Sequence, residues 1–153
     1  MSETPVRLRS KPTFLTTQLA THARRLVTDA FARAGARGYH YRVLATLEEN
    51  GPQSQADLGR SVNMDRSDVV AAVNQLSELG QVERRADPDD ARRKIVHLTA
   101  AGRRQLRRLD RELAEAQEQF VAPLDDTERA TLQRLLERLV DHHEATAATV
   151  ASD

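Results

Sequence analysis

The sequence contains no cysteine and no tryptophan, and its aromatic residues amount to only 3% of 153 residues. The absence of cysteine excludes disulfide bonds, thiolate nucleophiles and cysteine-ligated zinc sites. No apolar run approaches the roughly 18 residues that a transmembrane helix needs, and the first residues do not read as a signal peptide. The expectation is therefore a cytoplasmic protein without a membrane partner, with a core built from leucine, valine and alanine. Such a core favours a mainly helical fold.

The formal net charge is zero, but the charged residues are sorted into blocks. Residues 1–47 and 84–111 each carry a net charge of +6, whereas residues 48–83 carry −5 and residues 112–153 carry −7. Only two of the 23 basic residues are lysines. An arginine-rich block in a chain that is neutral overall indicates one basic face, as expected for a protein that contacts nucleic acid.

Apolar residues that recur at three- and four-residue steps predict a series of helices. Residues 1–11 lack this periodicity and are predicted to form a flexible arm. Residues 12–38 are predicted to hold a long amphipathic helix that ends at glycines, followed by a second helix that ends at Asn50-Gly51. Within residues 103–153, the apolar residues from Leu106 to Phe120 follow a 3-4-3-4 spacing, which is typical of helices that pack on another copy, and those from Leu132 to Val140 lie on one face of a further helix. We therefore expect 12–38 and 103–153 to be dimerisation helices of a homodimer.

The middle of the chain, residues 39–102, predicts a winged helix-turn-helix. Residues 54–57 and 65–68 both show a capping-box pattern, an oxygen-bearing cap followed three residues later by an acid, and each opens a short helix. Residues 81–85 and 94–98 are β-compatible and flank a charged turn, which predicts a two-stranded hairpin. The expected fold is mainly α with a small β-hairpin wing.

The second helix of such a motif enters the major groove of DNA with its first turn nearest the bases. There Arg66 can pair with guanine, and Asn63 or Asn74 with adenine. Asp68 has two interpretations, a helix cap or an acceptor for a cytosine amine. Cations on the hairpin suit phosphates and a narrow minor groove. The predicted DNA-contacting residues are Ser54, Asn63, Arg66, Ser67, Asn74, Arg84, Arg85, Asp90, Arg92, Arg93 and Lys94.

Residues 84–102 resemble the wing signature of the MarR family, the multiple-antibiotic-resistance regulators. The pattern is an acid, one residue, an arginine, then Val-x-Leu-Thr-x-x-Gly, and it is met by Asp90, Arg92, Val96, Leu98, Thr99 and Gly102. In element order the resemblance covers roughly residues 12–145. It implies a homodimeric transcription factor, usually a repressor, that binds a pseudo-palindromic double-stranded DNA site. By this resemblance Arg92 enters the minor groove and Asp90 orients it. The family often has a basic residue where this chain has Ala71 and Ala72, which shifts DNA contact onto Arg66, Ser67 and the wing.

The resemblance also implies a small-molecule effector, because family members commonly release DNA when a small, often phenolic anion binds. An aromatic wall with a cation suits an aromatic carboxylate. An equally open interpretation is that Tyr39 and Tyr41 simply pack the helix junction. The candidate ligand-binding residues are His22, Arg25, Tyr39, His40, Tyr41 and Arg42.

The sequence indicates no catalytic residues, no metal site and no cofactor. His142 and His143 are adjacent on a helix and diverge by about 100°, so they cannot chelate a metal as i, i+4 ligands would. Glycine-rich phosphate loops and the nucleophile and zinc motifs of hydrolases are missing, so we expect no enzyme. Two alternatives to a ligand-responsive repressor stay open. One is a winged-helix regulator without a small-molecule switch, and the other is a protein-interaction module that has lost DNA binding.

Overall fold

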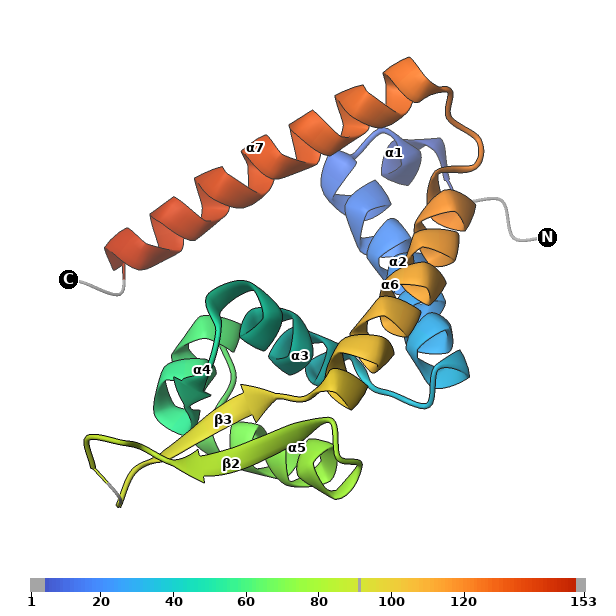
Figure 1. The fold of residues 1–153 in the computed structure, drawn as a ribbon. Coiled ribbons are helices and arrows are strands. Elements are labelled where there is room, and N and C mark those ends of the chain that lie inside the picture. The colour runs from blue at the N-terminus through green and yellow to red at the C-terminus, as the bar shows by residue number, and fades with distance from the viewer. Residues whose placement is uncertain (1–4, 91, 151–153) are drawn as a thin grey trace. The chain divides into compact units, whose positions relative to one another are not determined.

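The computed structural model describes residues 5–90 and 92–150 and is built from helices and one small sheet (Figure 1). The chain divides into two compact units, Met1–Ala116 and Gln117–Asp153. Residues 1–4 of the predicted arm and 151–153 of the predicted C-terminal helices lie outside the described residues. In the part that is described, no helix is long and apolar enough to cross a membrane.

The first unit holds the expected winged helix-turn-helix. Figure 1 shows its sheet with α3 and α4 above it and the β2–β3 loop projecting away from the helices. The mainly helical fold with a small wing is thus confirmed. The elements are α1 (Val6–Arg9), α2 (Pro12–Arg33), α3 (Gly38–Asn50), β1 (Gln53–Ser54), α4 (Gln55–Val62), α5 (Arg66–Glu78), β2 (Val82–Ala86), β3 (Lys94–Leu98) and α6 (Ala100–Val121), whose last residues belong to the second unit.

The start of the chain differs from the prediction of an arm without structure. Val6–Arg9 forms a single helical turn directly before α2, with backbone hydrogen bonds from Leu8 N to the Pro5 carbonyl and from Ser10 N to the Val6 carbonyl. A four-residue turn is too short to show apolar periodicity, so the sequence pattern could not reveal it. All its side chains are exposed.

The predicted capping boxes have different outcomes. The Ser54 hydroxyl accepts a hydrogen bond from Asp57 N at 3.2 Å, which confirms the cap of α4. Asp65 precedes α5 with extended backbone, but its side chain makes no capping hydrogen bond, so the second capping box is not formed. The carboxylates of Asp65 and Asp68 instead lie exposed at the surface.

The sheet has three antiparallel strands where the sequence predicted two. Strands β2 and β3 pair from Val82 with Leu98 to Ala86 with Lys94. The missed strand, β1, pairs with the other edge of β3, so the order is β1-β3-β2. Two residues are too few for an alternating pattern, so periodicity could not reveal this strand. Through β1, the wing is hydrogen-bonded to the residues that begin α4.

The core lies where α3, α4, α5 and the sheet meet the end of α2 and the start of α6. It is built mainly from leucine, valine and alanine, as the composition predicted, with Phe31 added. The burial of each leucine or valine side chain contributes roughly 1.5–3 kcal/mol. The inward side of α5 is thereby fixed, so its opposite side is presented to solvent. The largest fully buried side chains are Leu44, Leu58, Leu76, Leu109, Val43, Val69, Val73, Val82 and Val96.

The second unit contains the end of α6 and the long helix α7 (Asp126–Val150). A capping box begins α7, because Glu128 N donates to Asp125 Oδ1 at 2.9 Å and Asp125 N donates to Glu128 Oε2 at 3.0 Å. Arg129 and Glu118 form an ion pair at 2.9 Å across the turn between the two helices.

Gly102, at the start of α6, marks a close approach between this helix and the residue before β2. Thr99 caps the helix, because its hydroxyl accepts from Gly102 N at 3.0 Å and donates to the Gly80 carbonyl at 2.7 Å. A Cβ on Gly102 would lie 2.1 Å from the Gln81 carbonyl oxygen and 2.6 Å from Leu98 Cδ1. Only glycine fits here without a backbone shift.

We expect Gly102→Ala to destabilise the protein by about 1–3 kcal/mol, since a backbone carbonyl has to move. Thermal unfolding should show a melting temperature lower by several degrees. Gly59→Ala in α4 is the matched control, because its Cβ would lie 3.3 Å from the Val69 side chain and 3.6 Å from the Met64 carbonyl oxygen, and alanine favours the helix. Equal melting temperatures for the two variants would contradict this interpretation of Gly102.

Candidate nucleic-acid interface

The first turn of α5 presents the side chains that the sequence assigned to base contact. Val69 and Val73 are fully buried and fix the inner face of this helix. Arg66, Ser67 and Asp68 consequently lie exposed at its N-terminal end. Within the described residues, no hydrogen bond or ion pair engages the Arg66 guanidinium. It is therefore available to an external partner.

Two grooves flank this first turn. Three arginines from three helices, Arg42, Arg60 and Arg66, line the larger one, of about 620 Å³. The smaller, of about 410 Å³, lies between α3 and α5. Arg42 and Asp68 line both. The remaining residues of the larger groove are Gln55, Ala56, Gly59, Asn63, Met64 and Asp65, and those of the smaller are Tyr39, Met64 and Ala71.

Asn63 has a backbone role besides the predicted base contact. It ends α4 in the left-handed conformation, with φ 49° and ψ 55°. Asparagine tolerates this conformation better than most residues, so it suits the turn between the two helices of the motif. Its exposed side chain still lines the larger groove.

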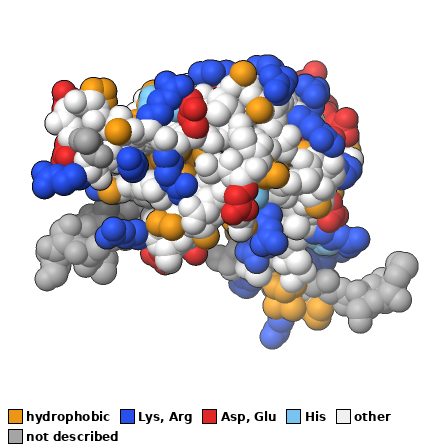
Figure 2. Space-filling model, turned by 60° about the horizontal axis from the view of Figure 1, so that its bottom comes forward, with side chains coloured by type: hydrophobic (Ala, Val, Ile, Leu, Met, Phe, Trp, Pro, Cys, Tyr) orange, Lys and Arg blue, Asp and Glu red, His pale blue; other side chains and the backbone are white. Residues whose placement is uncertain are grey.

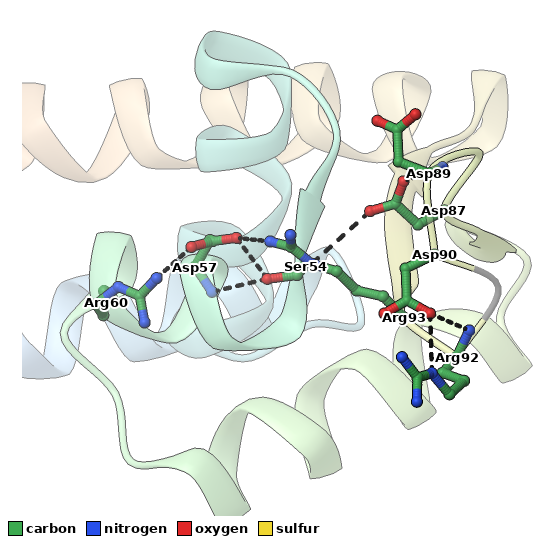
Figure 3. Close-up of polar contacts among 8 residues, drawn as sticks. All are labelled: Ser54, Asp57, Arg60, Asp87, Asp89, Asp90, Arg92 and Arg93. Atoms are coloured by element: carbon green, nitrogen blue, oxygen red, sulfur yellow. Dashed lines mark hydrogen bonds and ion pairs between the residues drawn. The ribbon is translucent and has the colours of Figure 1, made fainter.

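The wing carries the arginine–aspartate pair that the sequence suggested. Arg92 Nε lies 3.2 Å from Asp90 Oδ1, and the Arg92 backbone N–H donates to the same oxygen at 3.0 Å (Figure 3). The Arg92 side chain is 92% exposed. The expectation that a wing acid holds an arginine by a charge-assisted hydrogen bond is confirmed as a contact.

Arg93 points to the helix-turn-helix. Its guanidinium lies 2.8 Å from Asp57 Oδ2 and 3.8 Å from Asp87 Oδ2 (Figure 3). The Ser54 hydroxyl and the Arg60 and Arg93 guanidinium groups together lower the pKa of Asp57. Sequence analysis treated Asp57 only as part of a cap and missed this junction, because the partner lies 36 residues away in the chain.

The strand arginines are also engaged. Arg84 donates from Nε to Gln55 Oε1 at 3.3 Å and from Nη2 to Asn74 Oδ1 at 2.5 Å. Arg85 forms an ion pair with Glu83. Arg84 therefore joins β2 to α4 and α5, and the Asn74 oxygen already has a donor. Lys94 lies exposed at the start of β3.

Of the predicted ligand-binding residues, Tyr39 and Arg42 line the smaller groove together, and the others have different surroundings. His40 is buried, and it joins α3 to α5. Its Nδ1 accepts from Arg37 N at 3.3 Å, while its Nε2 lies 2.9 Å from Gln75 Oε1. Tyr39 donates its hydroxyl to the same Gln75 oxygen at 3.0 Å. These contacts fit the alternative interpretation, in which the residues pack a helix junction.

The other members of the predicted ligand cluster lie elsewhere. Tyr41 stacks on Phe31 with ring centroids 5.3 Å apart and donates its hydroxyl to Asp110 at 3.0 Å. Burial and the neighbouring Asp110 raise the pKa of Tyr41. His22 and Arg25 are exposed on α2, and Arg42 faces the grooves beside α5. Arg42 is thus a candidate DNA contact that the sequence had grouped with the ligand residues.

A separate groove of about 520 Å³ lies at the junction of α2 and α3. Arg24, Phe31 and Arg37 line it, together with small and aliphatic residues. A single chain therefore places two guanidinium groups, those of Arg24 and Arg37, in the same groove as the Phe31 ring. In the described part of the protein, no group of three or more His, Asp, Glu or Cys side chains could hold a metal ion.

Burial lowers the pKa of His40 from its usual 6.5, and the charge of Arg37 lowers it further, while the hydrogen bond with Gln75 acts in the opposite direction. The unfolded chain then binds more protons than the folded one below pH 6.5, so the free energy of unfolding should fall as the pH drops below that value. Urea unfolding across pH 5–7.5 tests this expectation. His40→Gln should flatten the dependence, and the exposed-site control His22→Gln should retain it. An unchanged slope in His40→Gln would contradict it.

A model of the MarR family matches residues 35–93. A protein of Thauera aromatica named as a transcriptional regulatory protein for the hcr operon is 37% identical over 110 residues, which cover 72% of this chain and 66% of that protein. The chain spans about half to two-thirds of the length of the curated relatives it matches.

Two solved structures match nearly in full. One is the crystal structure of a probable transcriptional regulator from Pseudomonas aeruginosa, whose sequence is 35% identical to this chain. The match has a TM-score of 0.73 and covers 86% of this chain and 98% of that one. The other is the crystal structure of the PcaV transcriptional regulator from Streptomyces coelicolor in complex with its natural ligand, whose sequence is 29% identical to this chain. This match has a TM-score of 0.70 and covers 92% of this chain and 98% of that one. The chain therefore belongs to the MarR family of winged helix-turn-helix transcriptional regulators, a family of DNA-binding proteins and not of enzymes.

Proposed function

We propose that this protein is a homodimeric repressor that binds a pseudo-palindromic site on double-stranded DNA. The observation that carries the proposal is a pair of exposed arginines at the two places where a winged helix touches DNA. Arg66 is exposed on the first turn of α5, and Arg92 is 92% exposed on the wing beside Asp90. A cytoplasmic location is part of the proposal, and membership of the MarR family supports it.

Each cation has a distinct role in the proposed complex. Arg66 donates two hydrogen bonds to a guanine in the major groove. Arg92 enters the minor groove, where the negative potential favours a guanidinium. Figure 2 shows Lys and Arg side chains spread over the face drawn there, with scattered Asp and Glu between them. Such a face attracts the phosphate backbone in a salt-dependent way.

In the proposed complex, residues that line the two grooves beside α5 contact the DNA phosphates. Arg42 is exposed, lines both grooves and has no ion-pair partner among the described residues. It supplies the cation that Ala71 and Ala72 do not provide on α5. Ser54, a predicted DNA contact, is buried and donates its hydroxyl to Asp57 Oδ2 at 2.5 Å, so its part here is to hold the start of α4. Arg84, Arg85 and Arg93 chiefly hold the wing and helices in register, because intramolecular acceptors already engage them.

The proposed dimer rests on apolar side chains that each unit leaves exposed. Leu15 and Leu19 on α2 are 42% and 50% exposed, and Leu139 and Val140 on α7 are 55% and 52% exposed. Burying such faces on a second copy is favourable. Two copies related by a two-fold axis would place two α5 helices in successive major grooves, about 34 Å apart. A dimer held there would block access of RNA polymerase to a promoter.

Selection of genomic DNA fragments by the purified protein tests the proposal, with excess competitor DNA at near-physiological salt. Recovery of a pseudo-palindrome with two half-sites supports a sequence-specific dimer. Recovery of no enriched sequence would overturn it and favour a protein-interaction module that has lost DNA binding.

We expect Arg92→Ala to weaken binding to the recovered site roughly tenfold and to reduce the slope of log K against log salt by about 1, as loss of one DNA cation predicts. Arg107→Ala is the control, because Arg107 is also exposed and unpaired among the described residues but lies on α6. Fluorescence anisotropy at four salt concentrations measures both quantities. An Arg92→Ala variant that matches Arg107→Ala would refute the wing assignment.

Release of DNA by a small aromatic anion is a second proposal. The groove with Arg24, Phe31 and Arg37 favours it, since guanidinium groups can bind a carboxylate beside an aromatic surface. The PcaV relative was crystallised with its natural ligand, which supports ligand binding in this family.

A panel of hydroxybenzoates should include one that raises the melting temperature and lowers affinity for the recovered DNA site. A ligand at 100 times its Kd stabilises the folded state by about 2.7 kcal/mol. Arg37→Ala should abolish the shift, whereas Arg25→Ala, on the exposed face of α2, should not. A panel without any shift at millimolar concentration would favour a regulator without a small-molecule switch.

A further inference from the structure

Two helices of the motif carry the same capping pattern, but their acids are engaged differently. In α4, the Asp57 carboxylate accepts from Ser54 and forms ion pairs with Arg60 and Arg93. In α5, Asp68 occupies the equivalent position, and no side-chain capping bond forms at that helix end. Across the part of the chain that the structure describes, no hydrogen bond or ion pair reaches the Asp68 carboxylate. This exposed acid has no structural partner.

Asp68 lies on the surface proposed to meet DNA. It lines both grooves beside the first turn of α5, and Arg42 lines both with it. A second observation points to an occupant of the larger groove. The side-chain nitrogen of Gln55, which lines that groove, is buried and lacks a hydrogen-bond partner among the described residues. Buried donors are normally satisfied, so the groove is suited to a partner that brings polar atoms.

The chemistry of DNA leaves few favourable partners for a carboxylate. An ionised carboxylate only accepts hydrogen bonds, and phosphates repel it. In the major groove the donors are the N6 amine of adenine and the N4 amine of cytosine. The adenine amine lies beside the N7 acceptor, which also repels a carboxylate, whereas cytosine has no acceptor on its own major-groove edge. The cytosine amine is therefore the partner that favours Asp68 most.

We propose that Asp68 is a specificity-determining residue that accepts a hydrogen bond from the N4 amine of one cytosine in each half-site. The inference rests on the proposed function, because it requires α5 to lie in the major groove. Arg42 and Arg66, which line the same groove, offset the repulsion between this acid and the phosphates. The donor and acceptor pattern of the first turn then reads two bases, guanine by Arg66 and cytosine by Asp68.

Base-by-base affinities of the full-length protein test the proposal. The DNA site recovered for the wild type is varied to all four bases at each position of a half-site, and binding is measured at constant salt. The wild type should prefer cytosine about tenfold at one position, in line with a single good base contact. Asp68→Ala should lose that preference and keep the others. Asp68→Asn should bind adenine at that position about as well as cytosine, because an amide can pair with adenine.

Asp126→Ala provides the matched control, since Asp126 is also an exposed acid in the first turn of a helix, α7. It should leave every base preference unchanged. An Asp68→Ala variant that binds all sequences more tightly by the same factor would overturn the proposal, because that result describes only relief of phosphate repulsion. An unchanged profile would overturn it as well. Thermal unfolding of both Asp68 variants separates a binding effect from misfolding.

The same experiment distinguishes failure of this inference from failure of the proposed function. If the wild type enriches no site, the DNA-binding function itself is refuted, and the role of Asp68 is refuted with it. If the wild type enriches a site with guanine dependent on Arg66 but without a cytosine dependent on Asp68, only the inference about Asp68 is wrong.

Discussion

The Asp57 carboxylate is the constraint on which the geometry of the proposed DNA-binding surface depends. It accepts from Ser54 at the start of α4, pairs with Arg60 one turn later, and pairs with Arg93 from the wing. Strand β1 adds a backbone link between the start of α4 and β3. The wing loop is thus attached to the helix-turn-helix at the residue next to Arg92. Because Arg93 is held, Arg92 projects from a fixed point although its own side chain is exposed.

Pairing of some arginines within the protein also explains how a chain with zero net charge can bind DNA, a polyanion. The block at 84–111 carries a net charge of +6, yet its Arg84, Arg85 and Arg93 are bound to side chains of the same protein. Among the described residues of the winged helix, the guanidinium groups of Arg42 and Arg66 lack such partners. The arginines that are paired within the protein orient its helices and strands, and the unpaired arginines are available to DNA. Total charge therefore says less about binding than the number of cations left unpaired.

Local patterns predicted the fold well and the contacts at the interface less well. The cap at Ser54, strand β3 and the Asp90–Arg92 pair follow from short-range chemistry, and the structure confirms them. Strand β1 is too short for periodicity, and the Asp57–Arg93 pair joins residues 36 positions apart. The predicted ligand cluster is divided for a related reason, because neighbours on a helix diverge by about 100°. Tyr39 and Arg42 line one groove, whereas Tyr41 stacks on Phe31.

The two capping patterns show how one local motif can serve structure at one helix and recognition at the next. Both place an acid near the positive end of a helix dipole, which stabilises the helix whether or not the acid is hydrogen-bonded. In α4 the acid has a hydroxyl donor and two arginines within reach, so its acceptors are used inside the protein. In α5 the cap is an aspartate, Asp65, which has no side-chain proton to donate to Asp68 when ionised. The acceptors of Asp68 consequently stay open toward the surface. Recognition of a base would cost this helix little stability, because no internal contact has to be broken to free the acid.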